Sequence, residues 1–401
     1  MFRRLFVILL VFCLLPAAFV SAEEKGSSDE PEIDITDLVQ FAEEETLNEK
    51  KDSDGAYILT ITCTGDFTIG GDNYHHKDVF TKVLNDHDGD INFVMQNVRD
   101  IFTDDDLTLI NFEGTFTDTT YVPPEKRENQ FLFNISPSYV SVLTNNSVEA
   151  VSLDNNHVRD HGDQGYEDTK STLSEAGVIY STPNDIGVFD FKGEVEIAML
   201  SYLCIDRYGD GFRRSKFSGE YSDEFLSHDT FEEAVCADIR KAKEQYPFVI
   251  VSFHWGKEPT KTNKIQGYIP TQNQIDLGHA AVDAGADLVI GHHSHRIQPI
   301  EYYNGTYICY SLGNFCFAGN NKPDDMNSII FQIRYRVKEG NITYKDFRVI
   351  PIRISSNKAE NDFIPTPFED SYERDGVINM LKENSLKYVQ YPVTEYPLEW
   401  R

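Results

Sequence analysis

Five short apolar runs in this chain are each followed by residues of the kind that bind metal ions. The runs cover residues 57–64, 107–112, 148–153, 248–253 and 288–290. The residues at or just beyond their ends are Asp66, Glu113, Asn156 with His157, His254, and His293 with His295. Carboxylate and amide oxygens combined with imidazole nitrogens form the ligand set of Mn, Fe or Zn. The pattern therefore predicts a metal-dependent centre, with two ions if a carboxylate or amide bridges them.

Each motif taken singly also has an ordinary structural interpretation. Gly65-Asp66 is a common turn after a strand, and His254 could be a hydrogen-bonded core residue. Residues 291–295 could be an exposed histidine cluster. Five independent turns would rarely all end in ligand-type residues, so their joint occurrence favours a genuine metal site.

The elements that must position these residues alternate along the chain. Helical patterns at 165–176, 230–245 and 272–284 lie between the apolar runs, which indicates an α/β sheet with parallel strands. Such sheets bind ligands beyond the carboxyl ends of their strands, so we expect the five strand ends to meet at one edge of the sheet. Further on, residues 328–337 and 342–354 alternate in period two around a polar turn, which predicts an antiparallel hairpin.

The charge of the chain excludes some classes of partner. Among its 401 residues, 66 are acidic and 36 are basic, which gives a net charge of −30. Such a surface repels nucleic acid and anionic membranes, so we expect no nucleic-acid partner. An anionic substrate should instead enter a local site with the help of metal ions.

The first residues predict export. Arg3 and Arg4 precede an apolar stretch over 5–20, and small residues follow before Glu23. This order is typical of a secretory signal cleaved after Ala22, and an uncleaved membrane anchor over 1–22 is the alternative. Residues 23–55 predict a disordered acidic linker. We therefore expect a protein that is secreted or held at the outer face of the cytoplasmic membrane.

The cysteines predict no disulfide framework. Five would remain after removal of a signal, at positions 63, 204, 236, 309 and 316, and no CxxC pair is present. Cys309 and Cys316 could form a disulfide, or both could be buried thiols.

Longer stretches of the sequence resemble the CapA family of capsule (poly-γ-glutamate) synthesis proteins, a branch of the calcineurin-like metallophosphoesterase fold. The matching motifs, spread over about residues 59–317, are Thr64-Gly65-Asp66, Asn111-Phe112-Glu113-Gly114, Asn155-Asn156-His157, His254-Trp255-Gly256, the stretch 283–293, and Tyr310-Ser311-Leu312-Gly313-Asn314-Phe315. The resemblance implies an α/β sandwich of mixed sheets flanked by helices over residues 56–355, with C-terminal antiparallel hairpin strands. Residues 356–401 would then be a C-terminal extension.

The same resemblance implies roles for individual residues. The positions that match metal ligands are Asp66, Glu113, Asn156, His254, His293 and His295. His157 matches the residue that protonates the leaving group in phosphoesterases. His292 is ambiguous, because either of two adjacent histidines could fill the first position of the His-x-His pair. The residues that could orient a ligand or a substrate are Asp160, Arg159, Glu258, His292 and Asn314.

Two departures from related phosphoesterases leave the function open. The residue two positions after Asp66 is not the histidine that those proteins usually carry there. Glu113 stands where they usually have an aspartate. The first hypothesis is an exported metal-dependent hydrolase or transferase that acts on an anionic extracellular polymer such as poly-γ-glutamate, or on its precursor. The second is a non-enzymatic accessory subunit of a membrane-bound polymer synthase or exporter. The third is a general metallophosphodiesterase.

Overall fold

The computed structural model describes residues 51–72, 78–127, 131–205, 211–213 and 225–401. The chain divides into two units, residues 1–58 and 59–401. In the described part of the first unit, Lys51 and Tyr57 form an antiparallel bridge, and the Lys51 ammonium lies 4.3 Å from the centre of the Tyr57 ring. The predicted export segment and most of the predicted linker lie outside the described residues.

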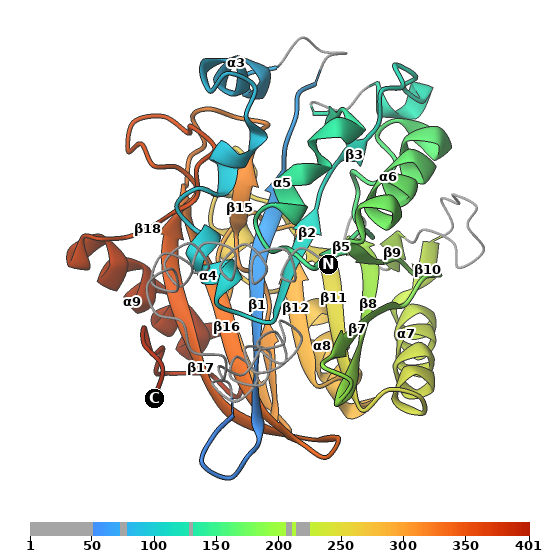
Figure 1. The fold of residues 1–401 in the computed structure, drawn as a ribbon, viewed down its shortest axis with the longest axis vertical. Coiled ribbons are helices and arrows are strands. Elements are labelled where there is room, and N and C mark those ends of the chain that lie inside the picture. The colour runs from blue at the N-terminus through green and yellow to red at the C-terminus, as the bar shows by residue number, and fades with distance from the viewer. Residues whose placement is uncertain (1–50, 73–77, 128–130, 206–210, 214–224) are drawn as a thin grey trace, which may run out of the picture. The chain divides into compact units, whose positions relative to one another are not determined.

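The second unit contains a first eight-stranded sheet, which we call sheet one (Figure 1). Its order is β18-β17-β16-β1-β2-β5-β6, and β15 also pairs with β1. The strands are β1 (Tyr57–Thr68), β2 (Leu107–Phe112), β5 (Ala150–Ser152), β6 (Ile179–Ser181), β15 (Asn314–Phe317), β16 (Asn327–Lys338), β17 (Asn341–Arg353) and β18 (Thr366–Pro367). Strands β1, β2, β5 and β6 run parallel, whereas β16 and β17 form the predicted antiparallel hairpin.

A second eight-stranded sheet, sheet two, has the order β10-β9-β8-β11-β12-β14-β13, and β7 pairs with β8. Its strands are β7 (Gly187–Phe191), β8 (Val195–Ile205), β9 (Gly211–Arg213), β10 (Phe225–Ser227), β11 (Phe248–Gly256), β12 (Leu288–His292), β13 (Ile300–Tyr303) and β14 (Thr306–Cys309). Strands β8, β11, β12 and β14 are parallel. The prediction of parallel strands is confirmed, but the prediction that all five strand ends share one sheet edge is wrong, because β1, β2 and β5 lie in sheet one and β11 and β12 lie in sheet two.

Aromatic rings join the two sheets into a sandwich. Tyr307 of β14 packs against Phe347 of β17 with ring centres 4.9 Å apart, and Phe248 of β11 packs against Tyr335 of β16 at 4.8 Å. These contacts bury the apolar residues on the facing sides of the sheets. The two sets of carboxyl strand ends are therefore held against each other, and the candidate ligands can meet between the sheets.

Helices cover the outer faces of the sandwich. On sheet two, α7 (His228–Lys243) and α8 (Gln272–Asp283) contribute Phe231 and Leu277 to a core shared with Val251 and Phe253 of β11. Sheet one shares its core with shorter helices and one longer helix, namely α3 (Phe80–Asp86), α4 (Arg99–Thr103), α5 (Ser141–Thr144) and α6 (Gly162–Ala176), together with the 3₁₀ turns η1 (Ile91–Met95) and η3 (Pro137–Val140). The expected arrangement of mixed sheets flanked by helices is confirmed (Figure 1).

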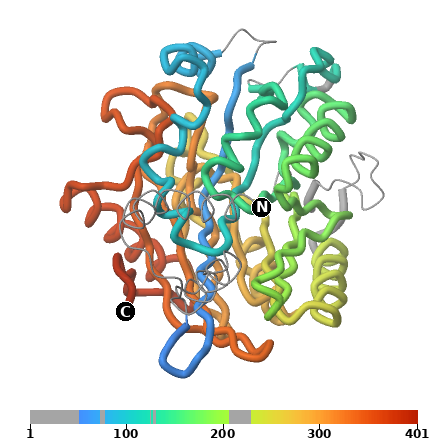
Figure 2. Tube along the Cα trace, in the orientation of Figure 1, coloured from blue at the N-terminus to red at the C-terminus, as the bar shows by residue number. Residues whose placement is uncertain are grey.

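The segment 356–401 packs onto the sandwich. Its helix α9 (Ser371–Tyr388) begins at an N-cap, Asp370, whose carboxylate accepts hydrogen bonds from the N–H groups of Tyr372 and Glu373. Val377 and Leu381 of this helix are buried. Figure 2 shows the red trace of this last segment beside the orange trace of β16 and β17. Residues 356–401 thus belong to the same compact unit as the sheets.

Two remaining features are the state of the cysteines and the length of the helices. All five described cysteines are buried free thiols, so Cys309 and Cys316 form no disulfide with each other. Within the described residues, every helix is too short or too polar to cross a membrane.

Candidate metal centre

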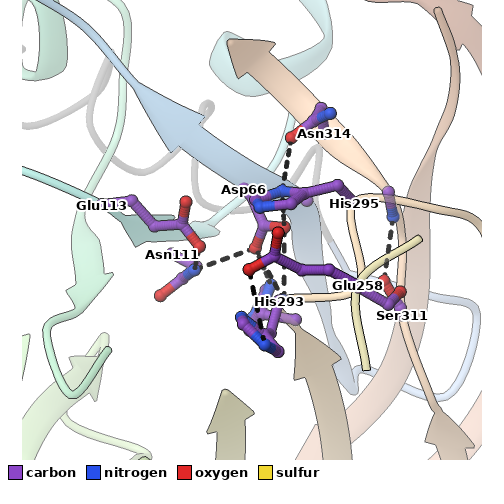
Figure 3. Close-up of polar contacts among 12 residues, drawn as sticks. Asp66, Asn111, Glu113, Glu258, His293, His295, Ser311 and Asn314 are labelled. Atoms are coloured by element: carbon purple, nitrogen blue, oxygen red, sulfur yellow. Dashed lines mark hydrogen bonds and ion pairs between the residues drawn. The ribbon is translucent and has the colours of Figure 1, made fainter. Parts of the chain in front are cut away.

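The first group of candidate ligands lies at the ends of β1 and β2. Asp66 sits at a β-bulge of β1, where the register with both β2 and β15 shifts, and bulges commonly redirect side chains beside functional sites. Glu113 follows β2 directly. One oxygen from each carboxylate and one ring nitrogen of His295 lie within 4.8 Å of one another (Figure 3). These three residues form what we call the first ligand set.

The second group comes from β5, β11 and the loop after β12. His254 Nε2 lies 2.6 Å from Asn156 Oδ1 and 3.0 Å from His293 Nδ1. An imidazole nitrogen that carries a proton cannot coordinate an ion, so His254 Nε2 and His293 Nδ1 form a second ligand set with Asn156 Oδ1 only when both nitrogens are unprotonated. The structure therefore brings together all six residues expected to bind metal.

Asn111 connects the two sets. Its Nδ2 lies 2.9 Å from Asp66 Oδ1, 3.2 Å from Glu113 Oε1 and 3.2 Å from His254 Nδ1. Its Oδ1 lies 3.4 Å from Asn155 Nδ2, which also donates to the carbonyl oxygen of Phe112 at 2.7 Å. Our sequence prediction omitted Asn111 as a site residue, although it belongs to the strand-end motif that contains Glu113.

Two glycines allow the main chain to pass close to the centre. A Cβ atom on Gly65 would lie 1.9 Å from the carbonyl oxygen of Gly313, which accepts a hydrogen bond from the Asp66 N–H at 2.9 Å. A Cβ atom on Gly291 would lie 2.1 Å from the carbonyl oxygen of Tyr310. A side chain at either position would therefore push β1 or β12 away from the segments that complete the centre.

The histidine loop after β12 has an unusual backbone. His293 and His295 have φ angles of 89° and 52°, in the left-handed region that costs side-chain-bearing residues free energy. The N–H of His293 lies 3.2 Å from one oxygen of Asp66 and 3.3 Å from the other. His295 Nδ1 lies 3.0 Å from Asp66 Oδ2 and 2.8 Å from Asn314 Oδ1. Asp66 and Asn314 thus hold the loop with both histidines turned toward the centre.

Burial and charge divide the titratable groups into two kinds. Burial lowers the pKa of His293 to about 4. Burial and the neighbouring His293 together hold the pKa of His254 well below its usual value. Both imidazoles are therefore neutral at pH 7, as metal ligation requires. Burial opposes the charge on His295 as well, but its hydrogen bond to Asp66 and the acidic groups around it prevail and raise its pKa to about 10, so His295 has to release a proton when an ion binds.

The two carboxylates shift in opposite directions. Burial alone would raise the pKa of Asp66, but the adjacent His292 and His295 overcome this effect and hold it well below its usual value. Burial and the negative charge of Asp66 raise the pKa of Glu113 well above its usual value. A proton on Glu113 is what a crowded pair of buried carboxylates requires when no cation lies between them.

Unpartnered buried atoms test whether the centre suits a metal. Glu113 Oε2 and both ring nitrogens of His292 are buried and make no hydrogen bond within the described residues. His292 Nδ1 lies 3.5 Å from Asp66 Oδ1, at the limit for such a bond. Buried polar atoms are rarely left without partners, and a cation between the two ligand sets would supply one to Glu113. The donor set and these atoms fit the predicted metal ions.

His157 is held by a buried acid and a lysine. Its Nδ1 lies 2.7 Å from Asp160 Oδ2, which also accepts a hydrogen bond from the Phe133 N–H at 2.9 Å. Lys126, at the end of the 3₁₀ turn η2 (Pro124–Lys126), donates to Asp160 Oδ1 at 3.2 Å and to the carbonyl oxygen of Asn156 at 2.7 Å. Burial would raise the pKa of Asp160, but His157 and Lys126 lower it overall, so Asp160 is ionised. Lys126 carries no motif that sequence analysis could have detected.

The remaining candidates divide into near and distant groups. Glu258 reaches the centre, with Oε1 3.8 Å from His293 Nε2, and Asn314 contacts His295 (Figure 3). Arg159 instead donates to Asp163 and stacks on Tyr166, both in α6. Position 68, two residues after Asp66, carries Thr68, whose hydroxyl donates to the carbonyl oxygen of Cys316. That position serves the pairing of β1 with β15.

This chain is similar in sequence to bacterial capsule synthesis proteins. The family model described as bacterial capsule synthesis protein PGA_cap matches residues 60–319. The PGA biosynthesis protein CapA of Bacillus subtilis is 30% identical over 302 residues, which cover 73% of this chain and 72% of that protein. The capsule biosynthesis protein CapA of Bacillus anthracis is 25% identical over 340 residues, covering 82% and 74%. The structure of the calcineurin-like phosphoesterase YfkN from B. subtilis aligns with a TM-score of 0.41 and 14% identity, over 82% of this chain and 99% of that one.

Proposed function

Because the chain belongs to the bacterial capsule synthesis protein family PGA_cap, we propose that it handles an anionic capsular polymer such as poly-γ-glutamate, or its precursor, through metal-dependent hydrolysis or transfer. The observation that carries this proposal is the convergence of two ligand sets, each of which combines residues from both sheets. Asp66, Glu113 and His295 would hold one divalent ion, and Asn156, His254 and His293 a second. Such ions, of Mn, Fe or Zn, lower the pKa of water and stabilise charge that develops on reacting oxygens.

The residues of the chain itself supply the proton chemistry. Because Asp160 is ionised and accepts the hydrogen bond from His157 Nδ1–H, the other ring nitrogen, Nε2, is the atom that can exchange a proton with a leaving group. Lys126 fixes the carboxylate of Asp160 and the main chain of Asn156 together. We assign His157 as general acid and Asp160 and Lys126 as the residues that orient it.

We further propose that residues 1–22 direct export or anchor the protein and that 23–55 form the linker to the folded body. The chain would then work at the outer face of the cytoplasmic membrane, where a capsular polymer emerges, beside a membrane-bound synthase. N-terminal sequencing of protein recovered from the host's medium and membranes tests this. A first residue of Glu23 indicates cleavage, and an intact Arg3-Arg4 segment in the membrane fraction indicates an anchor.

One observation favours an accessory role as the second candidate. Thr68 takes the place of a potential ligand, so the first ligand set has fewer donors than related phosphoesterases offer. In that case the centre holds metal for structure or polymer contact and does not hydrolyse.

The test combines metal content with turnover in the full chain. Elemental analysis should find about two transition-metal ions per chain, lost in a His293→Ala/His295→Ala double variant. His157→Ala should keep the metal but lower hydrolysis of bis-p-nitrophenyl phosphate with Mn²⁺ by about 10²- to 10⁴-fold. Metal retention without hydrolysis of phosphodiesters or γ-glutamyl amides in the wild type would favour the accessory role. A folded wild type that takes up neither Mn²⁺ nor Zn²⁺ would contradict the centre altogether.

A further inference from the structure

A cavity separate from the candidate metal centre is lined by residues of sheet one's side of the molecule. It has a volume of about 560 Å³ and opens between α3, the loop after β3 (Thr115–Phe116) and β4 (Asn134–Ile135). That volume is within the range of about 300–1,000 Å³ usual for small-molecule sites. None of the residues assigned above to the metal centre lines it.

The lining of this cavity is polar and almost uncharged. Its described lining residues include hydroxyl and amide side chains, among them Thr81, Asn85, Thr119 and Asn134, with one carboxylate, Asp118. They include no lysine or arginine. Among the described lining residues, a polyanion such as a γ-glutamyl chain would meet no compensating positive charge, in a protein whose net charge is already −30.

Apolar groups complete the lining. The ring of Tyr139 and the aliphatic side chains of Leu84, Val122 and Ile135 stand among the hydroxyls and amides. Burial lowers the pKa of the lining residue His161, so that residue is uncharged at pH 7. Sugar rings present both apolar C–H faces and hydroxyl groups, which this mixture of side chains complements.

One lining residue of the cavity, Asn134, has a buried oxygen that lacks a hydrogen-bond partner among the residues that the structure describes. Asn134 Oδ1 is buried and has no hydrogen-bond partner within the described residues, whereas the Nδ2 of the same amide donates weakly to the carbonyl oxygen of Thr117 at 3.5 Å. A buried acceptor of this kind requires a donor, which a ligand hydroxyl or amide would supply.

The cavity is connected to the metal centre by two short segments. Thr117 at the cavity follows Glu113 at the centre by only four positions, at most about 13 Å along an extended chain. Likewise, His157 and His161 stand four residues apart, and the Thr115 hydroxyl lies 3.2 Å from His161 Nδ1. A chain-like ligand of a few units could reach from one site to the other.

We infer that this cavity is a subsite for an uncharged glycan unit, separate from the site that handles the anionic polymer. The protein would thereby bind a neutral, hydroxyl- and amide-bearing sugar beside its metal centre. This inference goes beyond the proposed function, because glycan binding requires neither metal nor turnover.

Saturation-transfer NMR on the full chain tests the inference with chitotetraose, an uncharged N-acetylated glycan. The wild type should transfer saturation to the glycan, and Thr120→Trp, which fills the cavity from an exposed position, should reduce that signal at least fivefold. Asn85→Trp is a second filling variant on α3, in case the first disturbs folding. Thr343→Trp, at an exposed position of β17 outside the lining, is the matched control and should bind as the wild type does.

Three outcomes would overturn the inference. They are no transfer to the glycan in the wild type, equal transfer in both filling variants, and loss of tetra-γ-glutamate binding in those variants, which would assign the cavity to the anionic polymer. The His293→Ala/His295→Ala variant should still bind the glycan. A failure of the metal centre is thereby distinguished from a failure of the glycan subsite.

Discussion

Lys126 is the residue whose role the structure adds most clearly to the candidate centre. Its Nζ donates to an oxygen of Asp160 and to the main-chain carbonyl of Asn156, and its side chain is only 12% exposed. It therefore couples a proposed metal ligand to the acid that orients His157. A lysine in this position costs desolvation free energy, which two charge-assisted hydrogen bonds offset.

Replacement of Lys126 by methionine should impair turnover and leave the metal in place. Methionine keeps the apolar stem and removes the donors, so we expect kcat toward bis-p-nitrophenyl phosphate to fall about 10- to 100-fold, as for other residues that orient a catalytic group. Lys126→Arg should recover part of this loss. Lys382→Met, at an exposed position of α9, is the control and should behave as the wild type. Unchanged kcat in Lys126→Met would show that Lys126 does not orient the site.

At the scale of elements, the bend just before β2 contains a buried acid, Asp105, whose burial makes the folded chain less stable at high pH. Asp105 is 1% exposed, its Oδ2 accepts a hydrogen bond from the Thr108 hydroxyl at 2.6 Å, and its Oδ1 has no partner within the described residues. Burial raises the pKa of Asp105 to about 8, with a smaller contribution from the charges of Glu149 and Asp106. The bend that leads into this strand thus carries a carboxyl group that favours its protonated form.

Asp105→Asn should change how stability depends on pH. Because the folded state holds the Asp105 proton up to about pH 8 and the unfolded chain releases it near pH 4, the wild type loses stability as pH rises through this window. Asparagine cannot titrate, so the variant should gain up to about 4 kcal/mol relative to the wild type between pH 5 and pH 8. Urea unfolding at the two pH values measures the difference. Parallel curves for both proteins would contradict the assignment.

The strands of the fold could be predicted from sequence better than their arrangement. The apolar runs at 107–112 and 248–253 correspond to β2 and β11, and the period-two hairpin corresponds to β16 and β17. The division of these strands between two sheets could not be predicted. A strand that is buried on both faces is apolar throughout, so its sequence does not show which strand it pairs with. Helix α9 was missed because its buried residues, Val377, Leu381 and Ser385, form a narrow stripe among many polar residues.

The side chains that gather at the candidate centre could be predicted from the sequence, whereas the groups that hold them in place could not. Acid and histidine side chains directly after apolar runs mark Asp66, Glu113 and His254, since few other roles place such groups there. Asn111 points into the same centre from within a buried strand, and Lys126 comes from a separate loop. Their contributions depend on contacts between segments distant in sequence, and spacing along one chain does not show these contacts.

At the scale of the whole molecule, the net charge of −30 should govern how any polyanion approaches. Repulsion between like charges is screened by salt, so the affinity for a fluorescent γ-glutamyl decamer should rise between about 20 and 200 mM NaCl. Added Mn²⁺ should raise it further by bridging carboxylates. A nucleic-acid-binding protein shows the opposite salt dependence. Fluorescence anisotropy titrations provide the measurement, and an affinity that falls with salt would indicate a basic binding surface.

The position of β1 in sheet one has a consequence for the order of events during synthesis. This strand carries Asp66 and lies between β2 and β16, and the Thr68 hydroxyl at its end donates to the carbonyl oxygen of Cys316, 248 residues further along the chain. Loop closure over such a separation is slow, and one side of β1 stays unpaired until β15 and β16 have been made. The centre therefore cannot assemble before the chain has been made as far as β16, which ends at Lys338.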